Sequence, residues 1–252
     1  MISVILPTYN ELENIKVIIP EIFSVLKGSS LEGEIIVVDD NSPDGTAAVA
    51  MELVRGNPLK VFVRENERGL ATAVMKGFEI ASGDIYVVMD ADLSHPVGKI
   101  PEMVEPILIG NCDLTVGSRY TSGGECVDWT FMRRFTSKFS GLLAKGLTSL
   151  TDPTSGFMAI KKDTLNGIKL DPVGWKIVLE IIVKTGARFQ EVPIVFSDRL
   201  EGQSKLDTKV KAQYIAHLWK LYCFKYPAIF QLFKFCIVGS ISQLGMNWTE
   251  YR

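Results

Sequence analysis

Histidine and cysteine are both scarce in this chain of 252 residues, which has two histidines and four cysteines. The histidines, His95 and His217, are far apart in the sequence, and this disfavours a histidine-based metal site or catalytic triad. The cysteines form no CxxC pair, so the usual zinc motifs are excluded. They stand at positions 112, 126, 223 and 236. We expect them to be reduced thiols in a cytosolic setting, with no zinc site.

Two common glycine-rich motifs are missing. The chain contains neither GxGxxG nor GxxxxGKS/T, so it has neither a dinucleotide fingerprint nor a P-loop. Any nucleotide site in this chain must be built differently.

Long hydrophobic runs are also absent. The uninterrupted apolar stretch Phe235–Ile241 falls short of the ~20 residues that a membrane-spanning helix needs. We interpret residues 229–252 as an apolar tail that begins an incomplete or truncated transmembrane segment. At the other end, Met1 leads directly into SVILP, which is typical of a strand, so we expect no signal peptide.

The net charge is only −2, and 47% of the residues are hydrophobic. This composition suits one large domain with a sizeable core. Short β-branched segments alternate with segments of helical periodicity, which predicts an α/β Rossmann-like domain over residues 1–208. Its central sheet should be mostly parallel, with helices on both faces. The expected strands are 2–6, 34–38, 59–63, 85–89, 114–116, 158–161 and 189–196.

Polar and charged side chains collect at the carboxyl ends of these expected strands. They include Tyr9, Glu11, Asp40, Asp90, Asp92 and Arg119. Ligands bind at this edge of a doubly wound sheet. The sequence therefore predicts a binding site there.

Asp90 and Asp92 directly follow an apolar strand, within the segment MDADLSHP. Residues i and i+2 of an extended chain point the same way, and two carboxylates held together favour a cation between them. Oxygen ligands suit Mg²⁺ or Mn²⁺, which would neutralise a diphosphate. In the alternative, one aspartate caps the next helix and the other lies in a turn.

Other polar residues near the expected strand ends could cap helices or bind a nucleotide. Asn10 and Glu13 predict a capping box at the start of the first helix. The carboxylate of Asp40 offers acceptors to a base or ribose. Asp39 and Asp40 could instead be helix caps, a role that suits Asp44 better.

Four basic residues are candidate phosphate ligands: Arg119, Arg133, Arg199 and Lys205. Arginine binds phosphate with a bidentate fork and lysine binds it as a point charge. Arg199 and Lys205 lie in a glycine-containing loop that fits a mobile lid. Each of the four could instead be a solvated surface charge.

Residues 209–228 predict a helix with Val210, Tyr214, Leu218 and Tyr222 on one face. Its lysines and aromatic residues favour an amphipathic helix on a membrane surface. A helix that packs on the core is the alternative. Nucleic acid is not the expected partner, because the segment is too apolar and no recognised binding motif is present.

Short motifs in a fixed order point to a family. They are PTYNE at 7–11, VVDDNSPDGT at 37–46, MDADLSHP at 89–96, GSRY at 117–120, DPTSGF at 152–157, EVPIVFSDR at 191–199 and GQSKL at 202–206. The chain resembles the dolichyl-phosphate mannose synthases of glycosyltransferase family 2, which have the GT-A fold. The resemblance covers roughly residues 1–222.

The resemblance implies a donor site and a metal site. Its guanosine pocket corresponds to Pro7, Tyr9, Glu11, Val38 and Asp40. Its diphosphate and metal site corresponds to Asp90, Ala91 and Asp92. Ser94 joins the donor and metal residues because it stands where some relatives have a glutamine ligand.

The resemblance also implies roles for the basic residues. Arg119, Arg199 and Lys205 correspond to contacts with the sugar nucleotide. The acceptor phosphate would meet Arg119, Arg133, Ser137 and Arg199. Asp92, Arg119 and Arg199 would form the catalytic set.

The implied reaction is inverting transfer of mannose from GDP-mannose to dolichyl or another polyprenyl phosphate. Mg²⁺ or Mn²⁺ would stabilise the departing GDP, and the enzyme would act at the cytoplasmic face of a membrane. One alternative is a polyprenyl-phosphate glucosyltransferase that uses UDP-glucose, or an aminosugar transferase. Another is a non-catalytic sugar-nucleotide-binding protein associated with a membrane. The sequence indicates no particular protein partner.

Overall fold

The computed structural model describes residues 1–54, 56–127, 129–174, 176–197 and 208–228. The strands in these ranges are β1 Ile2–Thr8, β2 Gly33–Asp39, β3 Leu59–Val63, β4 Ile85–Val88, β5 Leu114–Ser118, β6 Glu125–Cys126, β7 Met158–Lys161, β8 Phe189–Pro193 and β9 Val195–Phe196. The α-helices are α1 Leu12–Gly28, α2 Thr46–Leu53, α3 Leu70–Ile80, α4 Ile100–Leu108, α5 Phe131–Ala144, α6 Ile177–Thr185 and α7 Thr208–Lys225. Two short 3₁₀ turns, η1 Val97–Lys99 and η2 Lys162–Leu165, complete these elements.

The central sheet has seven strands in the order β3-β2-β1-β4-β7-β5-β8. All neighbours are parallel except β7, which runs antiparallel to both β4 and β5. The prediction of a mostly parallel α/β sheet is confirmed. Because β7 runs backwards, the residues that precede it lie at the edge where β4 and β5 end.

The expected strand 189–196 is divided, so the prediction of a single strand is wrong. β8 pairs with β5 in the main sheet, whereas β9 pairs with β6 in a separate two-stranded sheet. Ile194 still donates its N–H to the carbonyl of Ser118 at the end of β5, whereas its own carbonyl accepts from the N–H of Glu125 at the start of β6. The chain therefore passes from one sheet to the other at Ile194.

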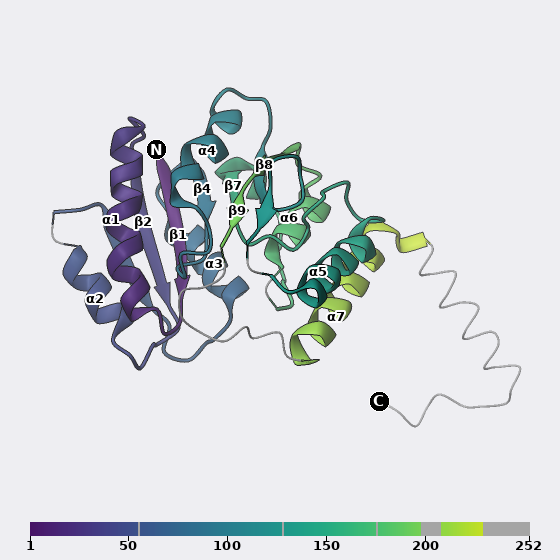
Figure 1. The fold of residues 1–252 in the computed structure, drawn as a ribbon, viewed down its shortest axis with the longest axis horizontal. Coiled ribbons are helices and arrows are strands. Elements are labelled where there is room, and N and C mark those ends of the chain that lie inside the picture. The colour runs from purple at the N-terminus through teal and green to yellow at the C-terminus, as the bar shows by residue number, and fades with distance from the viewer. Residues whose placement is uncertain (55, 128, 175, 198–207, 229–252) are drawn as a thin grey trace, which may run out of the picture.

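Helices cover both faces of the sheet, as predicted. Ile15 and Ile19 of α1 and Met103 of α4 pack on one face, together with Leu6 of β1. Helices α3 and α6 pack on the other face, which includes Ile5 of β1. Figure 1 shows α1 running alongside β2. This burial on both faces explains why the strands are continuously apolar.

The start of α1 differs from the prediction. No side chain of its own first turn caps α1, so the expected capping box of Asn10 and Glu13 is wrong. Instead, the N–H of Leu12 donates to Asp44 Oδ2 at 3.1 Å. Asp44 Oδ1 also accepts from the N–H of Thr46 at 3.0 Å, at the start of α2. Because Asp44 follows the neighbouring strand β2, it reaches both helices.

Helix α7 packs on the protein through the face that was expected to meet a membrane. Leu218 is 5% exposed, and the hydroxyls of Tyr214 and Tyr222 donate to the carbonyls of Ser140 and Leu143 at 2.8 and 2.9 Å. The last four carbonyls of a helix have no helical donor, and Tyr222 supplies one to Leu143. This face therefore packs on the protein, as in the core-packing alternative. Binding of the helix to a membrane surface stays a prediction.

Within the described ranges, no helix combines the length and the apolar composition needed to cross a membrane. Residues 229–252 lie outside the described ranges. The division into 1–208, 209–228 and 229–252 therefore stays a prediction.

Candidate active site

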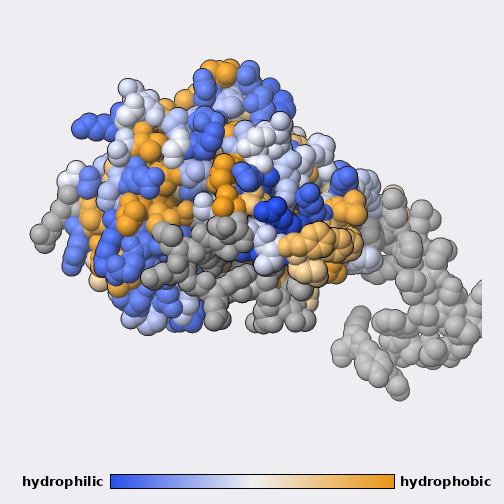
Figure 2. Space-filling view, viewed as in Figure 1, coloured by the Kyte–Doolittle hydropathy of each residue, from blue (hydrophilic) through white to orange (hydrophobic). Residues whose placement is uncertain are grey.

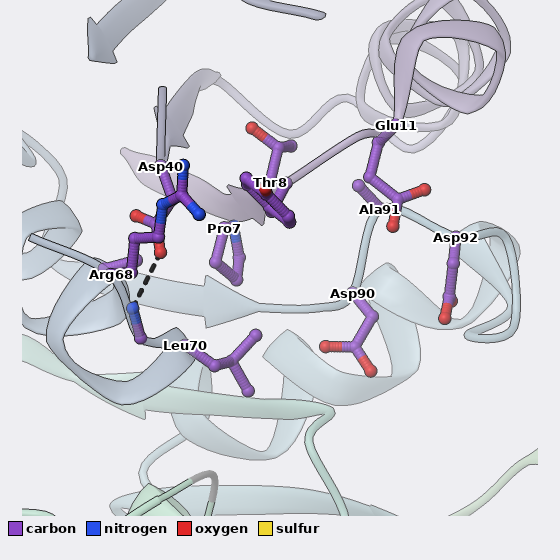
Figure 3. Close-up of a pocket in the computed structure, with 12 residues that line it drawn as sticks. Pro7, Thr8, Glu11, Asp40, Arg68, Leu70, Asp90, Ala91 and Asp92 are labelled. Atoms are coloured by element: carbon purple, nitrogen blue, oxygen red, sulfur yellow. Dashed lines mark hydrogen bonds between the residues drawn. The ribbon is translucent and has the colours of Figure 1, made fainter. Parts of the chain in front are cut away.

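A pocket opens at the carboxyl edge of the sheet, where β1, β2 and β4 end. It is lined by Pro7, Thr8, Tyr9, Glu11, Asp40, Arg68, Gly69, Leu70, Ala73, Asp90, Ala91 and Asp92. Figure 3 shows Asp40 and Arg68 at one end, and Glu11, Asp90 and Asp92 at the other. The structure thus brings together most of the predicted donor residues. Val38, however, is fully buried in the core and is not among the lining residues.

Asp40 is bound through both carboxylate oxygens. Its Oδ1 accepts from Arg64 Nε at 2.7 Å and also from Arg64 Nη2, while its Oδ2 accepts from the N–H of Gly69 at 2.7 Å. Arg64 is only 5% exposed, so this ion pair is buried. The predicted residues were found by a strand-end rule: site residues directly follow the carboxyl end of a strand. Arg64 follows the expected strand 59–63 and obeys this rule, but sequence reasoning missed it.

Arg68 and Tyr9 form a flat surface in the same part of the pocket. The guanidinium carbon of Arg68 lies 4.8 Å from the centroid of the Tyr9 ring. Planar rings and guanidinium groups are surfaces on which a nucleobase stacks. Arg68 was also missed, and it too stands between a strand and the helix after it.

Asp92 is held in a tight turn after β4. Its Oδ1 accepts from the N–H and the Oγ of Ser94, at 3.1 and 2.5 Å. Leu93 between them has a φ of 61°, a left-handed value that is unfavourable for a bulky residue and is found at functional sites. Ser94, predicted as a metal ligand, therefore orients Asp92 through hydrogen bonds.

Asp90 and Asp92 differ in exposure. The side chain of Asp90 is 28% exposed, whereas Asp92 is 4% exposed. In the described part of the chain, no group of three or more His, Cys, Asp and Glu side chains could hold a metal ion. Magnesium is usually bound by one or two carboxylates and completed by substrate phosphates and water. The two carboxylates therefore fit a cation that binds together with a diphosphate.

His95 supports Asp90 through the backbone. Its Nδ1 accepts from the N–H of Asp90 at 3.0 Å, and its ring stacks on Phe157 at 5.3 Å. Burial lowers the pKa of His95, against the opposing effect of Asp90 and Asp92. A neutral imidazole can accept this hydrogen bond. His95 therefore helps to fix the backbone that carries the two acids.

Arg119, predicted as a spare cation, is paired with Asp152. Arg119 Nε and Nη2 donate to the two Asp152 oxygens at 2.7 Å each, and Nη2 also donates to Thr154 Oγ1 at 2.8 Å. Burial raises the pKa of Asp152, but the hydrogen bonds and charge of Arg119 outweigh it, so the pKa is lowered. Asp152 and Thr154 belong to the DPTSGF segment and precede β7.

Two predicted phosphate ligands lie close to the aromatic ring of Trp129. Arg119 is 5.0 Å and Arg133 is 4.2 Å from its centroid. Ser137 lies on α5, one helical turn beyond Arg133. Arg199 and Lys205 lie outside the described residues. The structure thus places two of the four predicted cations at one ring.

Glu191 anchors the turn that holds Asp152. Its Oε1 accepts from Thr151 Oγ1 at 2.6 Å and from the N–H of Asp152 at 3.3 Å. Its Oε2 accepts from the N–H of Thr151 at 3.1 Å. The role of Glu191 was not visible in the sequence, because it depends on β8 lying beside β5.

Residues 3–168 match the family model described as glycosyl transferase family 2. A dolichol-phosphate mannosyltransferase from Pyrococcus furiosus is 42% identical, over 94% of this chain and 68% of that protein. A dolichol-phosphate mannosyltransferase from Saccharomyces cerevisiae is 39% identical, over 90% of this chain and 88% of that protein.

Among solved structures, a glucosyl-3-phosphoglycerate synthase from Mycobacterium tuberculosis has a similar fold. That structure is a complex with Mn²⁺, uridine diphosphate and phosphoglyceric acid. The TM-score is 0.68 at 23% identity, and the match covers 88% of this chain and 78% of that one. At this level of identity the similarity concerns the fold alone.

Proposed function

The chain belongs to glycosyltransferase family 2, and from this membership we propose that it transfers mannose from GDP-mannose to dolichyl phosphate. One observation carries the choice of substrates. Relatives named dolichol-phosphate mannosyltransferase match 90–94% of the chain, so the match includes the pocket and also the Arg119–Trp129–Arg133 cluster.

The pocket supports a sugar nucleotide that lies along its length. Tyr9 and Arg68 would stack the base, and Asp40 would accept a hydrogen bond from it or from the ribose. The diphosphate would lie at the other end, near Asp90 and Asp92. This arrangement is the donor site that we propose.

Asp90 and Asp92 would hold Mg²⁺ or Mn²⁺, and Ser94 would keep Asp92 in place through its two hydrogen bonds. When bound, such a cation neutralises phosphate oxygens and stabilises the negative charge on the departing GDP. The position of this acid pair at the pocket wall supports the assignment.

The acceptor phosphate would bind at Arg119 and Arg133. A phosphate monoester has a second pKa of about 6, so it is largely a dianion at neutral pH and needs no strong general base. One of its oxygens bonds to the anomeric carbon of mannose while the bond from that carbon to the GDP oxygen breaks. The electron pair leaves with GDP, and in-line displacement inverts the centre to a β-linked mannosyl phosphate. The side chains contribute alignment and charge.

Helix α5 supports binding to a membrane surface, where a lipid acceptor is found. Phe131, Phe135 and Phe139 are 78, 57 and 49% exposed, and their rings follow one another at 6.5 and 6.4 Å along the helix. Figure 2 shows apolar and strongly hydrophilic residues side by side over this region. Exposed aromatic residues beside cations are typical of an interfacial helix. The free thiols of Cys112 and Cys126 favour the cytoplasmic face.

The test is transfer of radiolabelled mannose from GDP-mannose to a short-chain dolichyl phosphate, with and without Mg²⁺ or Mn²⁺. We expect a metal-dependent product that is extracted into organic solvent. Transfer from UDP-glucose instead would replace the proposed donor. Tight donor binding without turnover on any lipid phosphate would favour a non-catalytic binding protein.

A further inference from the structure

Lys176 is a lysine in an unusual setting. It is partly buried immediately before α6, and its Nζ donates to the carbonyl O of Thr154 at 2.6 Å. Among the described residues, this is the one hydrogen bond that its ammonium group makes. An ammonium group carries three donors, so two of them are left for another ligand.

The partner of Lys176 lies between the two halves of the candidate site. Thr154 also accepts from Arg119 through its hydroxyl, so two cations bind one residue through separate atoms. Two residues further on, Gly156 faces Asp90: a Cβ added there would lie 3.6 Å from each Asp90 oxygen. Lys176 therefore binds the middle of a turn that extends from the acceptor cations to the donor acids.

In the part of the chain that the structure describes, no ion pair joins Lys176 to a carboxylate. Arg119 already uses both oxygens of Asp152. Burial, with a further effect from Arg119, lowers the pKa of Lys176 to about 8, and Asp152 and Asp90 oppose this shift. A desolvated cation without its own carboxylate is costly. An anionic ligand would supply the missing partner.

We propose that the Lys176 ammonium group binds a phosphate oxygen of the reacting substrates, next to Arg119 and Asp90. The phosphate belongs either to the lipid acceptor or to the sugar nucleotide, because the turn at Thr154 reaches both sites. This inference rests on the proposed function, since that function brings both phosphates to this place. It adds a cation that neither the sequence motifs nor the strand-end rule revealed.

The test compares Lys176→Met and Lys176→Arg with a matched control, Lys162→Met. Lys162 is exposed, and its replacement changes the net charge by the same amount. Calorimetry measures binding of GDP in one arm and of farnesyl phosphate in the other. A charge-assisted hydrogen bond corresponds to about a 10- to 100-fold change in affinity.

We expect K176M to weaken one of the two ligands by this factor, K176R to recover part of the loss, and K162M to match the wild type. Weaker farnesyl phosphate binding identifies the acceptor as the source, and weaker GDP binding identifies the donor. A folded K176M that binds both within about twofold of the wild type would overturn the proposal. If K176M does not fold, Lys176→Gln is judged by the same criterion.

Failure of the proposed function gives a different result. Wild-type protein that binds farnesyl phosphate and GDP but transfers no mannose would contradict the proposed reaction. The affinities of the Lys176 variants would still test whether Lys176 binds a phosphate.

Discussion

Arg64 holds Asp40 at one end of the pocket, and both side chains are almost completely buried, with 4 and 9% of their surfaces exposed. The pair joins the residue after β3 to the residue after β2. Gly69, at the start of α3, adds a further hydrogen bond through its N–H. Asp40 is therefore fixed in position before any ligand arrives, which reduces the entropy that binding must overcome.

Replacing Arg64 with Met should destabilise the protein strongly, because Asp40 would remain buried without a compensating charge. Breaking a buried ion pair by removing one partner lowers the free energy of unfolding by about 3–5 kcal/mol. Urea denaturation measures this change. The double variant R64M/D40N should recover part of the loss, and equal stabilities of R64M and wild type would contradict the buried pair.

Asp92→Ala should abolish sugar transfer, with a loss of at least about 100-fold, because the proposed cation and its diphosphate would lose a ligand. Steady-state rates over a titration of Mg²⁺ or Mn²⁺ test this. The control is Asp163→Ala, which removes an exposed acid whose side chain is 70% accessible. A D92A variant with the wild-type rate would rule out the metal-site assignment.

The pairing of Asp152 with Arg119 should make stability depend on pH in the acid range. The pKa of Asp152 is lowered in the folded protein because Arg119 outweighs the effect of burial. The unfolded value is about 3.9, so the stabilisation is present above about pH 4 and is lost as the pH falls through the lower folded value.

Denaturation of wild type and Asp152→Asn from about pH 7 down to about pH 3 measures this effect. The stability advantage of the wild type should stay constant near neutral pH and shrink below about pH 4. An advantage that persists unchanged through the acid range would refute the assigned direction of the pKa shift.

The exposed phenylalanines of α5 should carry membrane binding. Full burial of one such side chain contributes about 1.5–3 kcal/mol, so replacing Phe131, Phe135 and Phe139 with serine should weaken vesicle binding by at least about 10-fold. Co-sedimentation with anionic vesicles measures it. Val17, Met51 and Leu108, which are 52, 50 and 59% exposed on α1, α2 and α4, provide a matched triple serine control. An equal loss of vesicle binding in the control variant would show that membrane binding does not depend on the phenylalanines of α5.

The fold could be predicted from the sequence because apolar strands alternate with helical segments and each strand must be covered on both faces. The pocket at the ends of β1, β2 and β4 could be predicted as well, since Tyr9, Asp40 and Asp90 all stand at strand ends. Arg64 obeys the same rule but was overlooked, because a lone arginine after a strand resembles a surface charge.

Other parts of the site could not be predicted in this way. The strand-end rule selects residues that come directly after a strand, whereas Asp152 and Thr154 precede β7 and reach the site because that strand runs backwards. The pairing of Arg119 with Asp152 joins residues far apart in the chain. The packing of α7 on α5 could not be predicted, because periodicity shows an apolar face without showing which element covers it.

The reversed strand β7 also bears on how such an enzyme can change during evolution. Its backbone is hydrogen-bonded to β4 on one side and β5 on the other. The turn at 152–157 leads into this strand, so moving the turn would disturb the centre of the sheet. The outer face of α5, with Phe131, Phe135 and Phe139, carries no such constraint. A lineage that adopts a different lipid is therefore expected to accumulate substitutions on α5 and to keep the turn at 152–157 unchanged.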